Sequence, residues 1–248
     1  MSPRSRRPKP GPEPVGHAVR TYAAEQLGLR DITELFVTLV TGLLDDAGIN
    51  YLSVTGRTKS VASFAAKANR TGPDGQPLYA DPLVEITDQI GVRVITYLHT
   101  EVAAVAELLA DQLAILDDRD LGEETAREGR FGYSSRHVLV SPDPARPMAP
   151  PYDALAGHAA SIQVRTVLQH AWAEFEHDIR YKGSIPEEHA PDLNRRFTLA
   201  AGLLELADRE FSAIREVLQA LQRAFREASS VPDAPGTGPG EKYTGPVH

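Results

Sequence analysis

The residues best suited to chemistry begin with a basic run at positions 56–67, Gly-Arg-Thr-Lys-Ser-Val-Ala-Ser-Phe-Ala-Ala-Lys. Lys59, Ser63 and Lys67 are four residues apart, which places them on one face of a predicted helix, and Arg57 precedes the start of that helix. Because helix N-termini and cations both favour anions, the run is suited to binding a polyphosphate. An ordinary solvated basic helix face is the alternative interpretation.

A second pair of charged residues flanks the most apolar predicted strand, residues 90–98. Asp88 stands just before this strand and Arg93 lies within it. A charge in so apolar a segment is unfavourable unless it is paired or used. Arg93 could stack on a nucleobase or bind phosphate, and Asp88 could hold Mg²⁺ through its carboxylate. The two groups could instead satisfy each other or other partners at the sheet edge.

Aromatic and polar residues open another predicted strand, residues 133–140. Tyr133, Ser135 and His137 share one face of it by the two-residue period, with arginines at 130 and 136. A tyrosine flanked by arginines can stack on a base beside phosphate donors. The same pattern is also a common way for a strand to begin.

The predicted strand at 160–165 alternates strictly between polar and apolar residues. Ser161, Gln163 and Arg165 share one face, so this face of the strand is directed at something other than the core.

The helix predicted at 166–181 carries His170, Glu174 and His177 on neighbouring turns, a spacing that could ligate a metal. Hydrogen bonding around a buried Trp172 is the interpretation we favour for them.

Helices and strands alternate along the chain, which favours an α+β or α/β sandwich with a mixed sheet and sites at strand ends. We expect a basic leader without structure at 1–14, one domain at 15–228 and a second unstructured segment at 229–248. Further predicted elements are helices at 15–49, 58–69 and 101–112, strands at 51–54 and 114–116, a charged loop at 117–130, and a long helix at 191–228.

The helix predicted at 191–228 has an apolar seam with alternating spacings of four and three: Ala200, Leu204, Ala207, Phe211, Ile214, Leu218, Leu221 and Phe225. The seam could pack on its own domain or on another subunit, in a homo-oligomer such as a tetramer built through terminal helices.

Composition narrows the possible partners. The net charge of -8 argues against a surface that coats nucleic acid, although the arginines of the leader leave tRNA open. Cysteine is absent, which excludes disulfides and thiolate metal sites and is compatible with the cytoplasm. No apolar run is long enough to cross a membrane, so we expect a soluble, cytoplasmic protein.

Taken in order, these motifs resemble the RelA/SpoT synthetase domain, over roughly residues 51–182. The matching segments are Gly-Arg-x-Lys-x-x-x-Ser-x-x-x-Lys at 56–67, Asp-x-x-Gly-x-Arg at 88–93, Phe-Gly-Tyr-x-Ser-x-His at 131–137, and Gln-Val-Arg-Thr at 163–166 followed by His-Ala-Trp-Ala-Glu-Phe-Glu-His. The family transfers pyrophosphate from ATP to the 3′-hydroxyl of GTP or GDP, which makes the alarmones (p)ppGpp. Its fold is a nucleotidyltransferase-like mixed sheet flanked by helices, and this chain looks like a small stand-alone synthetase.

The resemblance also implies roles for residues. Those implied to bind ATP are Arg57, Lys59, Ser63, Lys67 and Arg93. Those implied to line the acceptor side are Tyr133, His137, Gln163, Arg165 and His170. Asp88 would bind the cofactor Mg²⁺, and the residues implied in catalysis are Asp88, Arg57, Lys59 and Gln163.

One position departs from the family. The strand motif reads Glu-x-Gln-x-Arg-Thr, and its glutamate is understood to activate the acceptor hydroxyl, whereas this chain has Ser161. Serine is no base near neutral pH, and Glu174 and Glu176 on the next helix are poor replacements. Three readings follow: an active synthetase relying on Asp88-bound Mg²⁺ or on another acid such as Asp153; a nucleotide-binding regulatory protein without synthesis; or an enzyme with another acceptor, the 3′ end of tRNA or an adenosine nucleotide.

Overall fold

A computed structural model describes residues 12–127, 135–182 and 189–229 of the chain. Its helices are α1 (Pro12–Asp46), α2 (Val61–Ala68), α3 (Pro82–Glu85), α4 (His99–Gln112), α5 (Leu121–Arg127), α6 (Val167–Lys182) and α7 (Ala190–Ser229), with a short 3₁₀ helix η1 (Tyr152–Leu155). Its strands are β1 (Ser53–Thr58), β2 (Ile90–Thr96), β3 (Ala114–Asp120), β4 (Arg136–Ser141) and β5 (Ala160–Thr166).

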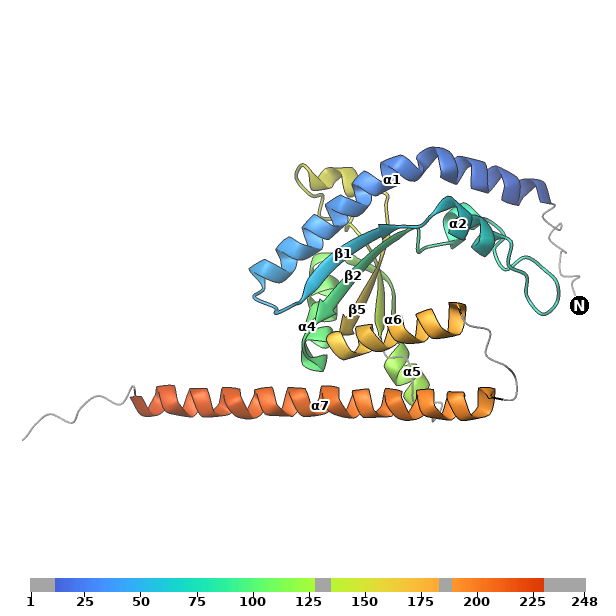
Figure 1. The fold of residues 1–248 in the computed structure, drawn as a ribbon. Helices are drawn as coiled ribbons and strands as arrows, with labels where there is room; N and C mark the ends of the chain where they lie inside the picture. Colours follow the sequence, from blue (N-terminus) through green and yellow to red (C-terminus); the bar gives the residue numbers. More distant parts are fainter. Residues whose placement is uncertain (1–11, 128–134, 183–188, 230–248) are drawn as a thin grey trace, which may run out of the picture.

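The five strands form one mixed sheet in the order β1-β2-β5-β4-β3 (Figure 1). Strands β2 and β5 are parallel, and the other neighbours are antiparallel. The predicted α+β fold with a mixed sheet and flanking helices is therefore confirmed.

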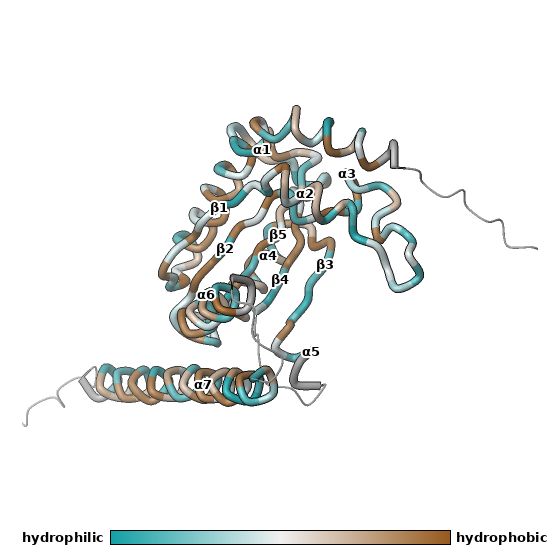
Figure 2. Tube along the Cα trace, turned by 45° about the vertical axis from the view of Figure 1, so that its right-hand side comes forward, coloured by the Kyte–Doolittle hydropathy of each residue, from teal (hydrophilic) through white to brown (hydrophobic). Residues whose placement is uncertain are grey.

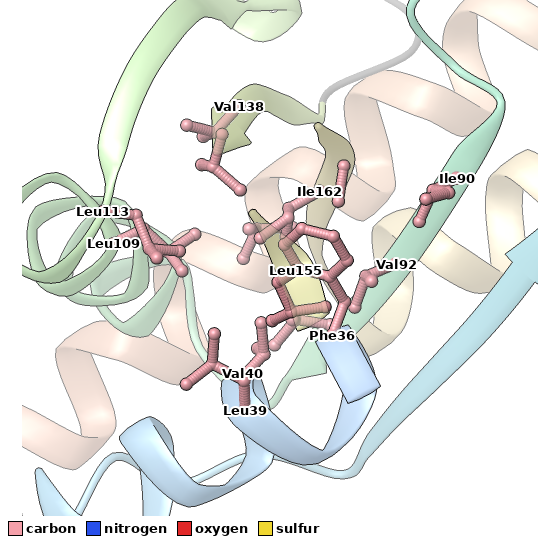
Figure 3. Close-up of a cluster of buried hydrophobic side chains, with 14 of the residues drawn as sticks. Phe36, Leu39, Val40, Ile90, Val92, Leu109, Leu113, Val138, Leu155 and Ile162 are labelled. Atoms are coloured by element: carbon pink, nitrogen blue, oxygen red, sulfur yellow. The ribbon is translucent and has the colours of Figure 1, made fainter. Parts of the chain in front are cut away.

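One face of the sheet is covered by α1 and α4, and the hydrophobic core lies between them and the strands. Phe36 and Val40 of α1 meet Val92 and Ile162 of the sheet in this core (Figure 3). Gly56 of β1 permits the close approach of α1, because a Cβ at this position would lie 2.7 Å from methyl groups of α1. Burial of these apolar side chains supplies the main driving force for the arrangement.

The opposite face of the sheet is polar, and α6 lies over one end of it. Helix α6 contacts β5 and β2, and its other side packs on α7. Trp172 of α6 meets Phe197 of α7 edge-on, with ring centroids 5.7 Å apart. The polar face thus has a helical wall at the ends of the two parallel strands.

Helix α7 divides into a packed half and a projecting half. The hydroxyl of Thr166, at the end of β5, donates a 2.6 Å hydrogen bond to the buried Asp208. Burial raises the pKa of this carboxyl. Beyond it, Phe211, Leu218 and Phe225 are each about half exposed or more, and α7 extends away from the sheet (Figures 1 and 2). The seam therefore packs on its own domain only along its first half.

Several elements differ from the sequence-based expectation. The loop predicted at 117–130 was wrong, because residues 117–120 extend β3 along β4 and α5 follows at once. Strand β1 runs on to Thr58, so Arg57 lies inside a strand and α2 starts only at Val61. Within the described residues, no helix combines the length and hydropathy needed to cross a membrane.

Candidate active site

The centre of the polar face is a row of side chains on three adjacent strands. Arg93 of β2 is the Cα partner of Gln163 of β5, which is also the partner of His137 of β4. Strands separated by about 4.8 Å place such partners side by side on one face. Three residues that are 26 to 70 positions apart in the sequence are thereby brought together.

The neighbouring row contains Ser161. Its Cα partners are Gly91 on β2 and Leu139 on β4, and Gly91 in turn faces Arg57 on β1. The side chain of Arg57 is exposed on the edge strand. Since Gly91 has no side chain, no β2 side chain stands between Arg57 and Ser161 in this row.

A cluster of two lysines and one carboxylate lies beside these rows. Lys59 Nζ is 2.8 Å and Lys67 Nζ is 3.0 Å from the two carboxylate oxygens of Asp88. Burial raises the pKa of Asp88, but hydrogen bonds and charge from both lysines outweigh it and hold the pKa below its usual value. Asp88 is therefore ionised at neutral pH. Its single negative charge leaves the cluster with Lys59 and Lys67 positively charged overall.

The predicted placement of Lys59 on the face of the helix is wrong. Ser60 is the N-cap residue of α2, with its Oγ accepting a hydrogen bond from the Ser63 amide, so Lys59 precedes the helix. The lysine nevertheless meets Lys67 at Asp88, because the Lys59 amide donates to the Gln89 carbonyl at 2.8 Å. The cations converge through the turn rather than through helical periodicity.

Helix α1 holds this turn in place from the core side. The hydroxyl of the fully buried Tyr22 donates a 2.7 Å hydrogen bond to the carbonyl of Lys59. The Tyr22 ring stacks on Phe64 of α2 with ring centroids 4.2 Å apart. Tyr22 of α1 therefore contacts both α2 and the backbone of Lys59, the residue proposed to bind phosphate.

Replacing Tyr22 by alanine is expected to destabilise the fold by about 3–5 kcal/mol, because it leaves a cavity beside Phe64 and removes the hydrogen bond. Tyr22→Phe keeps the stacked ring and should lose only about 1 kcal/mol. Urea unfolding followed by circular dichroism measures both variants. Equal losses would show that the ring does not pack as described.

Across the sheet, Arg165 is buried at the end of β5. Its Nε donates to Ser135 Oγ at 3.1 Å, and a terminal nitrogen donates to Gln163 Oε1 at 3.2 Å. Burial, and then the positive charge of Arg93, lower the pKa of Arg165 to about 10. The guanidinium remains charged at neutral pH and orients the side chain of Gln163.

Two histidines border this region. Burial, followed by the charge of Arg119, lowers the pKa of His137. Burial, followed by the charge of Arg93, lowers the pKa of His170. Both imidazoles are therefore neutral near pH 7, the state in which an imidazole has one donor and one acceptor nitrogen.

The metal-ligand interpretation of His170, Glu174 and His177 gains no support. No group of three such side chains in the described segments is arranged to hold a metal ion. Glu174 instead pairs with Arg93, with Oε1 and a terminal nitrogen 3.0 Å apart. This contact crosses from α6 to β2, and helical spacing gives no sign of it.

Two further predictions fall elsewhere. Tyr133 lies outside the described residues, so its place is untested. Asp153 is wrong as a substitute carboxylate on this face, because η1 packs against α1 and buries Leu155 in the core on the other side of the sheet. The contacts in this region that sequence reasoning missed are those of Tyr22, Ser135 and Glu174.

The chain is similar to known proteins. Residues 56–185 match the family model described as the region found in RelA / SpoT proteins. The chain is 32% identical over 182 residues to the GTP pyrophosphokinase YjbM of Bacillus subtilis (strain 168), covering 69% of this chain and 75% of that protein.

Solved structures show the same similarity. The small alarmone synthetase 1 from Bacillus subtilis aligns with a TM-score of 0.61 at 26% identity, over 81% of this chain and 98% of that one. The structure of that synthetase bound to its product pppGpp aligns with a TM-score of 0.62 at 26% identity, over 81% and 99% of the two chains.

Proposed function

The chain belongs to the RelA/SpoT family, and from this membership we propose that it is a GTP pyrophosphokinase that moves pyrophosphate from ATP to the 3′-hydroxyl of GTP or GDP. The observation that carries the proposal is the position of the Lys59–Asp88–Lys67 cluster beside the row of Arg93, Gln163 and His137. Lys59, Lys67 and Arg93 are proposed to bind ATP, and Gln163 and His137 to contact the second nucleotide.

The proposed reaction is a single displacement at phosphorus. The acceptor 3′-hydroxyl attacks the β-phosphorus of ATP and releases its proton to solvent, the bond from that phosphorus to the oxygen bridging to the α-phosphate breaks, and AMP leaves. Lys59, Lys67 and Arg57 spread the charge that develops on the transferred group. Ser63 adds a hydroxyl at the start of α2, where anions are favoured.

On the acceptor side, Gln163, His137, Arg165 and His170 are proposed to orient the guanosine nucleotide. Arg165 fixes Gln163 by the 3.2 Å hydrogen bond to its carbonyl oxygen, which leaves the amide nitrogen for the ligand. Tyr133 is proposed to stack on the guanine base. Fixing the acceptor in line with ATP lowers the barrier by restricting relative motion before reaction.

Asp88 fits the proposed Mg²⁺. Mg²⁺ prefers oxygen ligands and is commonly held by one or two carboxylates together with substrate phosphates and water. Asp88 is ionised and partly exposed, and Lys59 and Lys67 can turn from it to the phosphates. When bound, Mg²⁺ supplies charge neutralisation on the phosphates of ATP.

Purified protein incubated with labelled ATP, Mg²⁺ and one acceptor at a time tests this proposal. We expect a labelled guanosine product with GTP or GDP, and no labelled product with ATP alone or with tRNA. Transfer of label to tRNA or to an adenosine nucleotide would show that this molecule, and not GTP or GDP, is the acceptor. If ATP protects the protein against thermal unfolding but no acceptor becomes labelled, the protein binds nucleotides without carrying out synthesis.

We also propose that the projecting half of α7 assembles copies of the chain into a homotetramer. The support is an apolar stripe that finds no cover within the described residues: Phe211, Ile214, Val217, Leu218, Leu221 and Phe225. Apolar patches of this kind mark interfaces, and the spacing suits helix-to-helix packing.

Changing Leu218 and Leu221 together to glutamate is expected to reduce the mass in solution from tetramer to a smaller species. Charges in the stripe would have to be desolvated in the interface. Gln219→Glu with Gln222→Glu introduces the same charge beside the stripe and should leave the mass unchanged. Multi-angle light scattering measures both, and a monomeric unmodified protein would contradict the assembly.

A further inference from the structure

A carboxylate of α6 reaches an arginine of the central sheet. Arg93 lies in the middle of β2, and its terminal nitrogen is 3.0 Å from Glu174 Oε1. The two residues are 81 positions apart, so the contact exists only in the folded chain. Helix α6, which carries Glu174, lies against β5 and β2 (Figure 1).

The surrounding charges explain why a carboxylate is favourable there. Arg165 emerges from the neighbouring strand on the same face, and the positive charge of Arg93 contributes to lowering its pKa, while Glu174 acts in the opposite direction. His170 lies one turn before Glu174, with Nδ1 and Oε1 3.8 Å apart. Glu174 therefore counters the repulsion between two guanidinium groups within one site.

The pair adds little to the stability of the fold. The side chains of Arg93 and Glu174 are 34% and 56% exposed, and ion pairs of such exposure typically contribute about 0–1 kcal/mol. Its consequence is orientation. An arginine side chain carries about 2 kcal/mol of rotamer entropy, and a partner at one terminal nitrogen restricts its rotamers without occupying the planar faces of the guanidinium, which can stack.

We propose that Glu174 is a positioning residue that holds the guanidinium of Arg93 ready for the base of ATP. The inference rests on the proposed function in one respect, the assignment of Arg93 to ATP. Glu174 acts before and during nucleotide binding, through Arg93, and takes no part in the transfer itself. Its loss should therefore weaken ATP binding without slowing the chemical step.

The first test is the steady-state rate of the full-length variant Glu174→Gln, which keeps the shape and removes the charge. We expect the KM for ATP to rise about three- to tenfold, with kcat within about twofold and the KM for GDP unchanged. Glu205→Gln, which removes an ion pair with Arg209 on α7, is the matched control and should change neither constant. A fall in kcat at unchanged KM would overturn the proposal, as would the absence of any effect.

The second test does not need turnover. Isothermal titration with a non-hydrolysable ATP analogue and Mg²⁺ gives a Kd for the unmodified protein, Glu174→Gln, Arg93→Gln and the double variant. We expect Glu174→Gln to weaken binding three- to tenfold and to add no further loss in the Arg93→Gln background. Additive losses would overturn the positioning role. An unmodified protein that binds the analogue but makes no product would contradict the proposed function while leaving this inference intact.

Discussion

Replacing Asp88 by asparagine is expected to reduce the rate of alarmone synthesis about 10³-fold or more, which corresponds to about 4 kcal/mol of transition-state stabilisation. Asparagine keeps the size of the side chain but removes the charge that pairs with Lys59 and Lys67 and that suits Mg²⁺. Initial rates at saturating ATP, GDP and Mg²⁺ measure the effect. A variant within tenfold of the unmodified enzyme would show that Asp88 is not the metal ligand.

The stability of Asp88→Asn at different pH values tests the ion-pair cluster independently of the rate. The pKa of Asp88 is depressed, so the carboxylate stabilises the fold above its unfolded value of 3.8 and loses this contribution as the pH falls through the folded pKa. The unmodified protein and Asp88→Asn should differ in unfolding free energy at pH 7, and the difference should shrink as the pH falls below 3.8 and through the folded pKa of Asp88. A difference that persists unchanged into acid would contradict the ion-pair cluster.

Changing Ser161 to glutamate is expected to raise kcat about tenfold or more. The family motif has glutamate at this place, and a positioned general base typically contributes about 10²–10⁴ in rate. The Cα partner of Ser161 on β2 is Gly91, which has no side chain to meet the added carboxylate. Rapid-quench measurement of a single turnover isolates the chemical step.

Ser161→Gln is the matched control, because it adds the same bulk without a base. It should show no acceleration, and both variants should bind ATP as the unmodified protein does. A Ser161→Glu variant no faster than Ser161→Gln would show that the site has diverged beyond this one residue.

The regular elements were predictable where one physical signal dominated. The strand predicted from the β-branched run at 90–98 is β2, which ends two residues earlier at Thr96, and the alternation of Ser161, Gln163 and Arg165 with apolar neighbours places a polar face on β5. Both signals come from burial on one side of a strand. The charged segment at 117–120 gave no such signal, because an edge strand is exposed and tolerates Asp117 and Asp118.

The candidate site was predictable in its residue types but not in its contacts. The spacing of Lys59 and Lys67 suggested convergence, and both meet Asp88, although through a turn rather than one helix face. The pairing of Arg93 with Glu174 depends on where α6 crosses the sheet. Such a crossing is set by packing between α6 and α7, which no local pattern encodes.

The most direct test of the proposed reaction is its stoichiometry. Enzyme, Mg²⁺, ATP and GDP are incubated, and the nucleotides are quantified by ion-exchange chromatography with mass detection. Transfer of pyrophosphate predicts AMP and ppGpp in a one-to-one ratio, each formed at the rate at which ATP disappears. ADP in place of AMP, or AMP without a phosphorylated guanosine product, would contradict pyrophosphate transfer by this chain.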